Sequence, residues 1–473
     1  MASSSAPAKL PIPAAKLLSS NPHVVPGQLV VTEQWFEVPL DYENPSAGTI
    51  RLFGRTGTKR ETPIIPPDEE PAPKPYIVYL QGGPGFGCPQ PQDFPAAKVL
   101  IDRGYQVLML DHRGVGLSTP VSTEMLQRLP GGEDAQYHYL RLMRQDNTVR
   151  DCEAVRMCLT AGLSGPKAQW SIIGQSYGGF IALSYLSMHP EGLREAFLTG
   201  GLAPVGQTAE QQYARTYGHV AKRNAQYFAK FPEDVAALRQ IATFIESQEG
   251  GGVKMPGGGL LTVPRLMTIG ISFVGHGGFD SVHAILLQLK ASLDSFGFLS
   301  RTALTAVAAV TPLDNNIIYA ILHEAIYCDG PGCVSNWAAH RVGQSLDNFW
   351  WLQPGASVAN TDKPLLFAGE MMYPFLFETL PELIPLRNLA ERLAKADDWP
   401  ALYDQEQMKK NKVPVYCASY VDDMAVDYGY GSATARMIGA KTFETNVMYH
   451  NAVRAKVDEV MTNLFALRDD TLD

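Results

Sequence analysis

The clearest chemical signal in the sequence is a serine between glycines, in the run Gly174-Gln-Ser176-Tyr-Gly178-Gly179. A short apolar run over residues 170–173 precedes it, and a helical pattern over residues 180–188 follows it. This order of strand, tight turn and helix is typical of a nucleophile elbow, in which small neighbours let the turn expose a serine hydroxyl. The sequence therefore predicts that Ser176 is a nucleophile for covalent catalysis.

A second glycine-rich run, Gln81-Gly-Gly-Pro-Gly-Phe-Gly87, follows the apolar residues 76–80. Glycines allow backbone N–H groups to face a developing oxyanion, so we expect the N–H groups of Gly83 and Tyr177 to form an oxyanion hole. A phosphate-binding loop is the alternative, but the run lacks the Lys-Ser/Thr pair that such a loop requires.

A serine nucleophile needs a base, and on this kind of scaffold the chain order is serine, acid, histidine. Apolar residues 413–418 predict a late strand, and His450 is the one histidine that follows it. The sequence therefore predicts His450 as the base.

Four carboxylates are candidates for the acid that orients this base. Asp423, just after the late strand, is favoured, with Asp422 as the alternative and Asp427 interpreted as a loop or cap residue. Glu370 is a separate candidate, because residues 363–370 can also be interpreted as a strand with an acid at its end.

Two patterns that could bind a metal are incomplete. His323-Glu324 begins like a zinc-protease motif, but Tyr327 stands where the second histidine is required. Cys328 and Cys333 bracket a turn, and no second Cys/His pair follows at zinc spacing, so they are interpreted as thiols beside a turn. We expect no metal and no organic cofactor.

Apolar strands that alternate with helical patterns predict an α/β fold with a mostly parallel sheet, opened by an antiparallel hairpin over residues 29–38 and 49–53. The alternation stops near residue 206 and resumes near residue 405. We therefore expect an N-terminal arm (1–26), a core in two parts (27–205 and 406–473) and a mainly helical cap insertion (206–405).

Composition limits the partners. The chain has 473 residues, 45% of them apolar, and a net charge of −9, which does not suit a nucleic-acid partner. No run approaches the about 20 apolar residues of a membrane helix, and the N-terminus has no signal-peptide pattern. We expect a cytoplasmic protein with no membrane partner.

Taken together, the motifs resemble those of the prolyl aminopeptidases (proline iminopeptidases), which are serine peptidases of the α/β-hydrolase fold. The similarity is closest to the longer members with an enlarged helical cap. It rests on Gly82-Gly-Pro-Gly85, Asp111-His-Arg-Gly-Val-Gly-Leu-Ser-Thr119 and the serine motif, and continues through Met255-Pro-Gly-Gly-Gly-Leu-Leu-Thr262, Leu322-His-Glu-Ala-Ile-Tyr327, Gly369-Glu-Met-Met-Tyr-Pro374 and Asp422-Asp-Met424.

This resemblance implies release of an N-terminal proline from small peptides through an acyl-enzyme, with Ser176, Asp423 and His450 as the catalytic residues. It also implies that Glu324 and Glu370 hold the free α-amino group of the substrate. For either glutamate, a structural salt bridge in the cap is the alternative.

Two positions depart from the family pattern, since Gln81 replaces a histidine and Ala452 replaces a glycine. Two other functions stay open on the same scaffold. One is an esterase, lactonase or amidase that acts on a small metabolite, and the other is a binding protein without catalysis. An epoxide hydrolase or dehalogenase would need aspartate at position 176, where serine stands.

Overall fold

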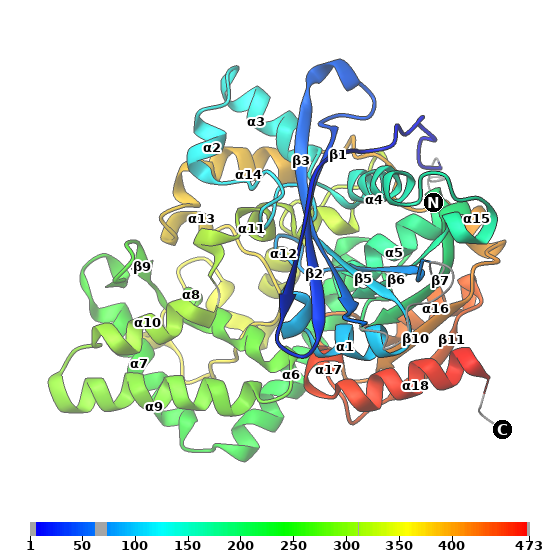
Figure 1. The fold of residues 1–473 in the computed structure, drawn as a ribbon. Coiled ribbons are helices and arrows are strands. Elements are labelled where there is room, and N and C mark those ends of the chain that lie inside the picture. Colours follow the sequence, from blue (N-terminus) through cyan, green and yellow to red (C-terminus); the bar gives the residue numbers. More distant parts are fainter. Residues whose placement is uncertain (1–5, 62–72, 311, 471–473) are drawn as a thin grey trace.

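The computed structural model describes residues 6–61, 73–310 and 312–470. Its centre is a nine-stranded sheet in the order β1-β2-β3-β5-β4-β6-β7-β10-β11 (Figure 1). These strands are β1 (Lys16–Val25), β2 (Leu29–Pro39), β3 (Thr49–Lys59), β4 (Tyr76–Leu80), β5 (Gln106–Leu110), β6 (Trp170–Gln175), β7 (Leu193–Thr199), β10 (Val415–Tyr420) and β11 (Lys441–Thr445).

Strands β4 to β7, β10 and β11 run parallel, whereas β1, β2 and β3 are joined by antiparallel pairing. The predicted hairpin is therefore confirmed as β2 and β3. Strands β6 and β10 are buried along their whole length, because helices cover both faces of the parallel part. This arrangement confirms the predicted α/β fold with a mostly parallel sheet.

Alternate side chains of each central strand enter different cores. Val78 and Ile172 pack with α4 (Gln145–Leu159) and α5 (Tyr177–Met188) on one face. Ile77 and Ile173 pack with α1 (Pro95–Asp102) and α18 (Val457–Asp469) on the other. The other helices of this part are α2 (Thr123–Gln127), α3 (Gly132–Arg141), α16 (Tyr428–Ile438) and α17 (Ala452–Ala455). This layering holds the carboxyl ends of the strands in place, where the loops of the site begin.

The predicted N-terminal arm over residues 1–26 is part of the sheet at Lys16–Val25, which form β1 and pair along β2. Most side chains of β1 are exposed, because it is the edge strand, so no alternation of buried and polar residues marks it. Residues 1–5 of the predicted arm lie outside the described residues.

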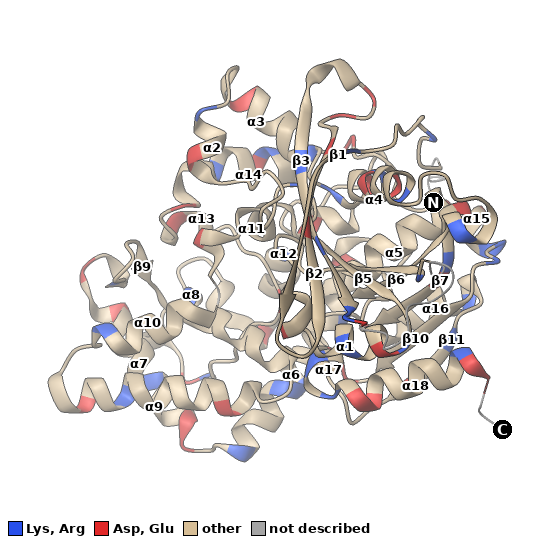
Figure 2. Cartoon of the chain, viewed as in Figure 1, with Lys and Arg blue, Asp and Glu red and all other residues tan. Residues whose placement is uncertain are grey.

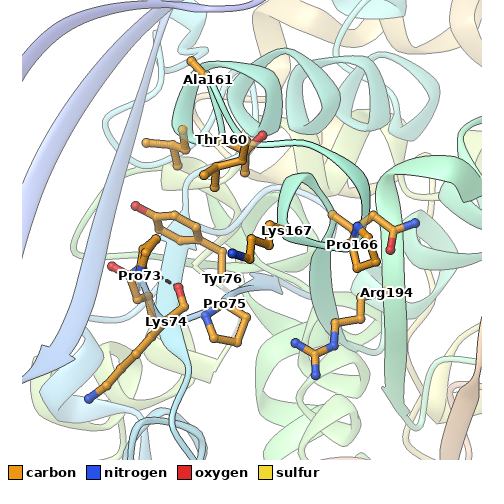
Figure 3. A pocket seen from close by; sticks show the side chains of 13 residues that line it. Pro73, Lys74, Pro75, Tyr76, Thr160, Ala161, Pro166, Lys167 and Arg194 are labelled. Atoms are coloured by element: carbon orange, nitrogen blue, oxygen red, sulfur yellow. Dashed lines mark hydrogen bonds between the residues drawn. The ribbon is translucent and has the colours of Figure 1, made fainter. Parts of the chain in front are cut away.

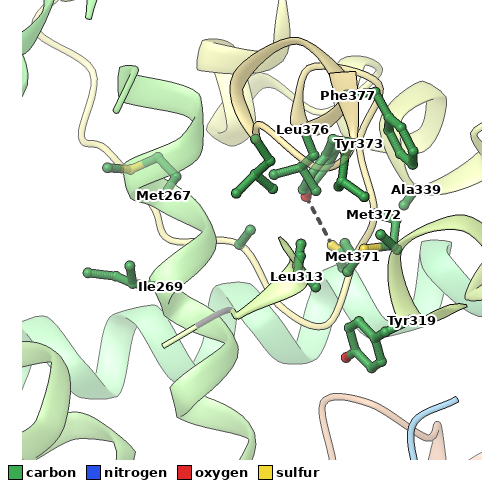
Figure 4. Packing of buried hydrophobic residues seen from close by; sticks show 14 of the residues in the cluster. Met267, Ile269, Leu313, Tyr319, Ala339, Met371, Met372, Tyr373, Leu376 and Phe377 are labelled. Carbon is green, nitrogen blue, oxygen red and sulfur yellow. Dashed lines mark hydrogen bonds between the residues drawn. The ribbon is translucent and has the colours of Figure 1, made fainter. Parts of the chain in front are cut away.

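Between β7 and β10 the chain forms a mainly helical insertion, whose apolar side chains pack in one cluster with residues of α2 and α3 (Figure 4). In Figure 4, Met267, Leu313 and Phe377 are among the side chains of that cluster. Its elements are α6 (Ala209–Lys230), α7 (Asp234–Ser247), β8 (Val253–Lys254), β9 (Leu260–Leu261), α8 (Val263–Met267), α9 (Gly278–Phe296), α10 (Arg301–Val310), α11 (Ile317–Leu322), α12 (Ala338–Gln344), α13 (Leu376–Thr379), α14 (Arg387–Ala394) and α15 (Gln405–Lys409). We call residues 206–405 the cap; its boundaries as a domain stay a prediction.

The alternative strand over residues 363–370 does not form. Backbone groups of Phe367 bond to the side chain of Asn224, and the N–H of Ala368 donates to Met267 O, so this segment is held by helices and not by a strand.

Charges of both signs alternate along the ribbon in Figure 2, and neither sign dominates the view. Within residues 6–61, 73–310 and 312–470, no helix combines the length and apolar character needed to cross a membrane.

Candidate active site

The serine motif forms a sharp turn between β6 and α5. Ser176 has φ 58° and ψ −127°, a strained conformation for a residue with a side chain. The glycines are required by close backbone approach, since a Cβ on Gly178 would lie 1.9 Å from the carbonyl oxygen of Leu80, and one on Gly174 would lie 2.4 Å from that of Gly178. The turn therefore has the geometry of a nucleophile elbow.

A chain of short hydrogen bonds joins Ser176 to two residues from the C-terminal part of the sequence. Ser176 Oγ lies 2.7 Å from His450 Nε2, although 274 residues separate them. His450 Nδ1 lies 2.7 Å from Asp423 Oδ2. All three side chains are buried. The arrangement can pass a proton from hydroxyl to imidazole while the carboxylate holds the ring.

The second oxygen of Asp423 is also occupied. Oδ1 accepts hydrogen bonds from the backbone N–H groups of Ala425 (2.8 Å) and Val426 (3.2 Å). These bonds lock the carboxylate, so that Oδ2 faces the histidine.

The electrostatic environment makes His450 a stronger base. Burial alone would lower its pKa, but the charge and hydrogen bond of Asp423, with the charge of Glu370, raise the pKa above the ordinary value for histidine. A raised pKa favours proton uptake from the serine hydroxyl.

The other candidate acids lie elsewhere. Asp422 forms an ion pair with Lys222 at 2.6 Å. Asp427 accepts the N–H of Tyr430 (2.9 Å) as the N-cap of α16, as its interpretation as a cap residue predicted. Glu370 accepts a hydrogen bond from Tyr319 Oη at 2.6 Å. The structure thus brings only Asp423 of these four to the imidazole of His450.

The predicted oxyanion residues flank the serine, one from the start of α5 and the other from the loop after β4. Tyr177 is the first residue of α5, so its N–H has no acceptor within the helix. The loop carrying Gly83 lies against the nucleophile, because a Cβ on the adjacent Gly82 would lie 3.0 Å from Ser176 Cβ. Arg454 donates to Gln81 Oε1 at 3.2 Å, so the glutamine that replaces the family's histidine is braced from α17.

The two predicted amine-binding glutamates are both in the cap. Glu324 is buried, and its oxygens accept the N–H groups of Ala338 (3.0 Å) and Ala339 (2.9 Å) at the start of α12. Burial raises the pKa of Glu324 to about 7 against the effect of these bonds. The salt-bridge alternative has no support in these contacts, which are hydrogen bonds to backbone and, for Glu370, to Tyr319.

Tyr213 in α6 is a buried residue that no motif in the sequence singled out. Its side chain is 1% exposed, and its hydroxyl has no hydrogen-bond partner among the described residues. Burial raises the pKa of Tyr213 well above the ordinary value, and the charges of Glu324 and Glu370 raise it further. No pattern in the sequence around Tyr213 indicates its position.

A cavity of about 590 Å³ lies away from these residues (Figure 3). Its lining includes Tyr76, Gln106 and Arg194, at the amino ends of β4, β5 and β7. Ser176 follows the carboxyl end of β6, so the cavity and Ser176 lie at opposite ends of the parallel strands.

Within the described part of the chain, one group could offer three metal ligands, namely Glu233, Asp234 and His283, whose ligand atoms lie within 4.8 Å of one another. Asp234 Oδ2 already accepts a hydrogen bond from Tyr227 and lies 2.9 Å from His283 Nδ1. These contacts already engage Asp234 and His283 with each other and with Tyr227.

The chain is similar to proteins of the α/β-hydrolase fold and to proline iminopeptidases. A family model described as the alpha/beta hydrolase fold matches residues 75–244. A proline iminopeptidase of Aspergillus aculeatus is 35% identical over 460 residues, covering 97% of this chain and 98% of that protein. A proline iminopeptidase of Aeromonas sobria is 37% identical over 455 residues, covering 96% of this chain and all of that protein (100%).

Among solved structures, a proline iminopeptidase of Mycobacterium smegmatis aligns with a TM-score of 0.41 at 12% identity, covering 89% of this chain and 95% of that one.

Proposed function

Because the chain belongs to the proline iminopeptidase family, we propose that it releases N-terminal proline from peptides through an acyl-enzyme on Ser176. The observation that carries this proposal is the line of two 2.7 Å contacts from Ser176 Oγ through His450 to Asp423. Serine alone is a weak nucleophile at neutral pH, and this arrangement supplies the base that it needs.

In the first step, Ser176 Oγ attacks the carbonyl carbon of the N-terminal proline while His450 Nε2 takes the hydroxyl proton. Asp423 stabilises the imidazolium that forms, and the N–H groups of Gly83 and Tyr177 stabilise the oxyanion. His450 then gives its proton to the leaving amine. In the second step, water attacks the carbonyl carbon of the acyl-enzyme while His450 Nε2 takes a proton from the water. His450 then returns the proton to Ser176 Oγ, and proline is released.

The restriction to a free N-terminus comes from the cap. A secondary ammonium group enters a buried region, where it needs opposite charge nearby, and Glu324 and Glu370 supply carboxylates there. An acetylated proline has no charge to pair with them, and its binding would leave a buried carboxylate without compensation.

The cap also limits the length of the substrate. The segment between β7 and β10 is mainly helical, and we assign the binding of the α-amino group to its Glu324 and Glu370. Small peptides are therefore the proposed substrates.

All six cysteines are free thiols, which supports a reducing, cytoplasmic environment.

The test uses three chromogenic substrates, namely proline 4-nitroanilide, N-acetylproline 4-nitroanilide and 4-nitrophenyl acetate. We expect release from the free proline anilide and little from its acetylated form. Ser176→Ala should abolish release, and Ser247→Ala, at the exposed end of α7, should leave it unchanged. Turnover of the acetylated anilide at the rate of the free amine would instead assign the site to an amidase, and turnover of the ester without any release from the free proline anilide would assign it to an esterase.

A further inference from the structure

A short segment of the cap holds the backbone on both sides of the proposed base. The N–H of His450 donates to Val274 O at 3.2 Å. The N–H of Tyr449 donates to His276 Nε2 at 3.2 Å, and the N–H of His276 donates to Asn451 Oδ1 at 2.9 Å. Three consecutive residues, 449 to 451, are thus bonded to the cap residues 274 and 276.

Side chains of the cap also pack against residues 449–451. The Arg223 guanidinium lies 4.0 Å from the ring centroid of Tyr449 and 4.1 Å from that of Phe279. The rings of His276 and Tyr449 are 5.0 Å apart. A Cβ on Gly275 would lie 2.7 Å from Asn451 Nδ2, so the two segments are in direct contact. Arg223 of α6 and residues 274–276 of the cap therefore contact the loop that carries His450.

The hydrogen bond from Tyr449 requires a neutral imidazole. His276 Nε2 is the acceptor, so the ring proton is on Nδ1, and an imidazolium has no acceptor to offer. The groups that face His276 favour this state, since burial, Lys456 and Arg223 lower its pKa, and only Glu459 opposes them.

We propose that His276 is a positioning residue for the reaction, whose neutral imidazole holds the loop of His450 at the distance that Ser176 requires. The proposal rests on the proposed function, in which His450 is the base. It gives the cap a second task besides substrate recognition, because the triad is assembled only while the cap segment stays in contact with residues 449–451.

The test compares His276→Leu, which removes the acceptor, with His276→Gln, whose Oε1 can accept the same N–H. The readouts are the rate at which a fluorophosphonate labels Ser176 and the kcat and KM for proline 4-nitroanilide. A displacement of about 1 Å in a catalytic group costs up to about 100-fold. We expect His276→Leu to lower labelling and kcat by about 10- to 100-fold with little change in KM, and His276→Gln to recover most of the rate.

Asp280→Asn is the control, since Asp280 lies four residues beyond His276, in α9, and pairs with exposed Lys230 at 2.7 Å. Its labelling rate should equal that of the wild type. Equal labelling by His276→Leu and the wild type would overturn the proposal.

The pH profile is the second measurement and needs only the conservative variant. In the wild type, protonation of His450 and of His276 both lower the labelling rate, so over the acid range in which His276 titrates the logarithm of that rate should fall with a slope steeper than about 1, against about 1 for His276→Gln. If His276→Leu does not fold, superimposed profiles of the wild type and His276→Gln refute the proposal. Labelling reports on the serine and histidine alone, so a wild type that is labelled but releases no proline contradicts only the proposed substrate.

Discussion

Replacing Asp423 by asparagine exchanges one oxygen for an amide nitrogen, and the surrounding hydrogen bonds decide which way the new group faces. Oδ1 accepts two backbone N–H groups, from Ala425 at 2.8 Å and Val426 at 3.2 Å. The carbonyl oxygen of asparagine must stay there, so its NH2 group points at His450 Nδ1. Because that NH2 group donates, the imidazole has to carry its proton on Nε2.

A proton on Nε2 removes the acceptor that lies 2.7 Å from Ser176 Oγ. In a serine triad this wrong tautomer lowers kcat by about 10,000-fold, which corresponds to about 5.4 kcal/mol of transition-state stabilisation. We expect a loss of that order in the release of 4-nitroaniline from proline 4-nitroanilide, with KM changed far less.

Asp422→Asn is the matched control, because it makes the same chemical change one residue earlier in the chain. Asp422 pairs with Lys222, whose side chain is 54% exposed, and exposed pairs contribute little. Its kcat should stay within about 2-fold of the wild type. An Asp423→Asn enzyme with more than about a tenth of the wild-type kcat would refute the tautomer argument, and a comparable loss in Asp422→Asn would transfer the role to the neighbouring carboxylate.

Two further outcomes follow from the site. Gly178→Ala places a Cβ 1.9 Å from Leu80 O, so its free energy of unfolding in urea should fall by at least about 3 kcal/mol, whereas Gly218→Ala in α6, where a Cβ meets nothing within 4 Å, should not destabilise the protein. Equal stability of the two variants would contradict the close packing of the elbow. Since the pKa of Glu324 is about 7, its carboxylate is charged above that pH, and the inhibition constant of the pyrrolidinium cation should fall as pH rises through 7. Glu324→Gln should abolish that dependence, and an unchanged profile would remove Glu324 from the amine site.

The features that could be predicted are those encoded in a few consecutive residues. A Cβ at position 174 or 178 would overlap the backbone, so the elbow requires glycine at both positions. The spacing of these glycines around Ser176 can therefore be recognised in the sequence. The buried strands β6 and β10 are visible as apolar runs, because both faces of the sheet are covered. Chain order then indicated His450 as the partner of Ser176.

The features that could not be predicted depend on contacts between distant segments. Asp422 and Asp423 are adjacent and alike, and only the turn after Tyr420, with its two N–H donors to Asp423, distinguishes them. The exposed edge strand β1 carries no hydrophobic pattern. The contact between His276 and Tyr449 joins residues 173 positions apart, and no local pattern encodes it.

Because β7 pairs with β10, this part of the sheet cannot form until the chain has been synthesised as far as β10. Thr199 ends β7 and Val415 begins β10, so about 215 residues must be synthesised before the partner strand exists. At a synthesis rate of about 5–20 residues per second, the side of β7 that pairs with β10 stays unpaired for about 10–40 s in each nascent chain. During that interval the half-made sheet can add a strand from another chain, so each molecule depends on the insertion folding quickly or on a chaperone that covers the edge.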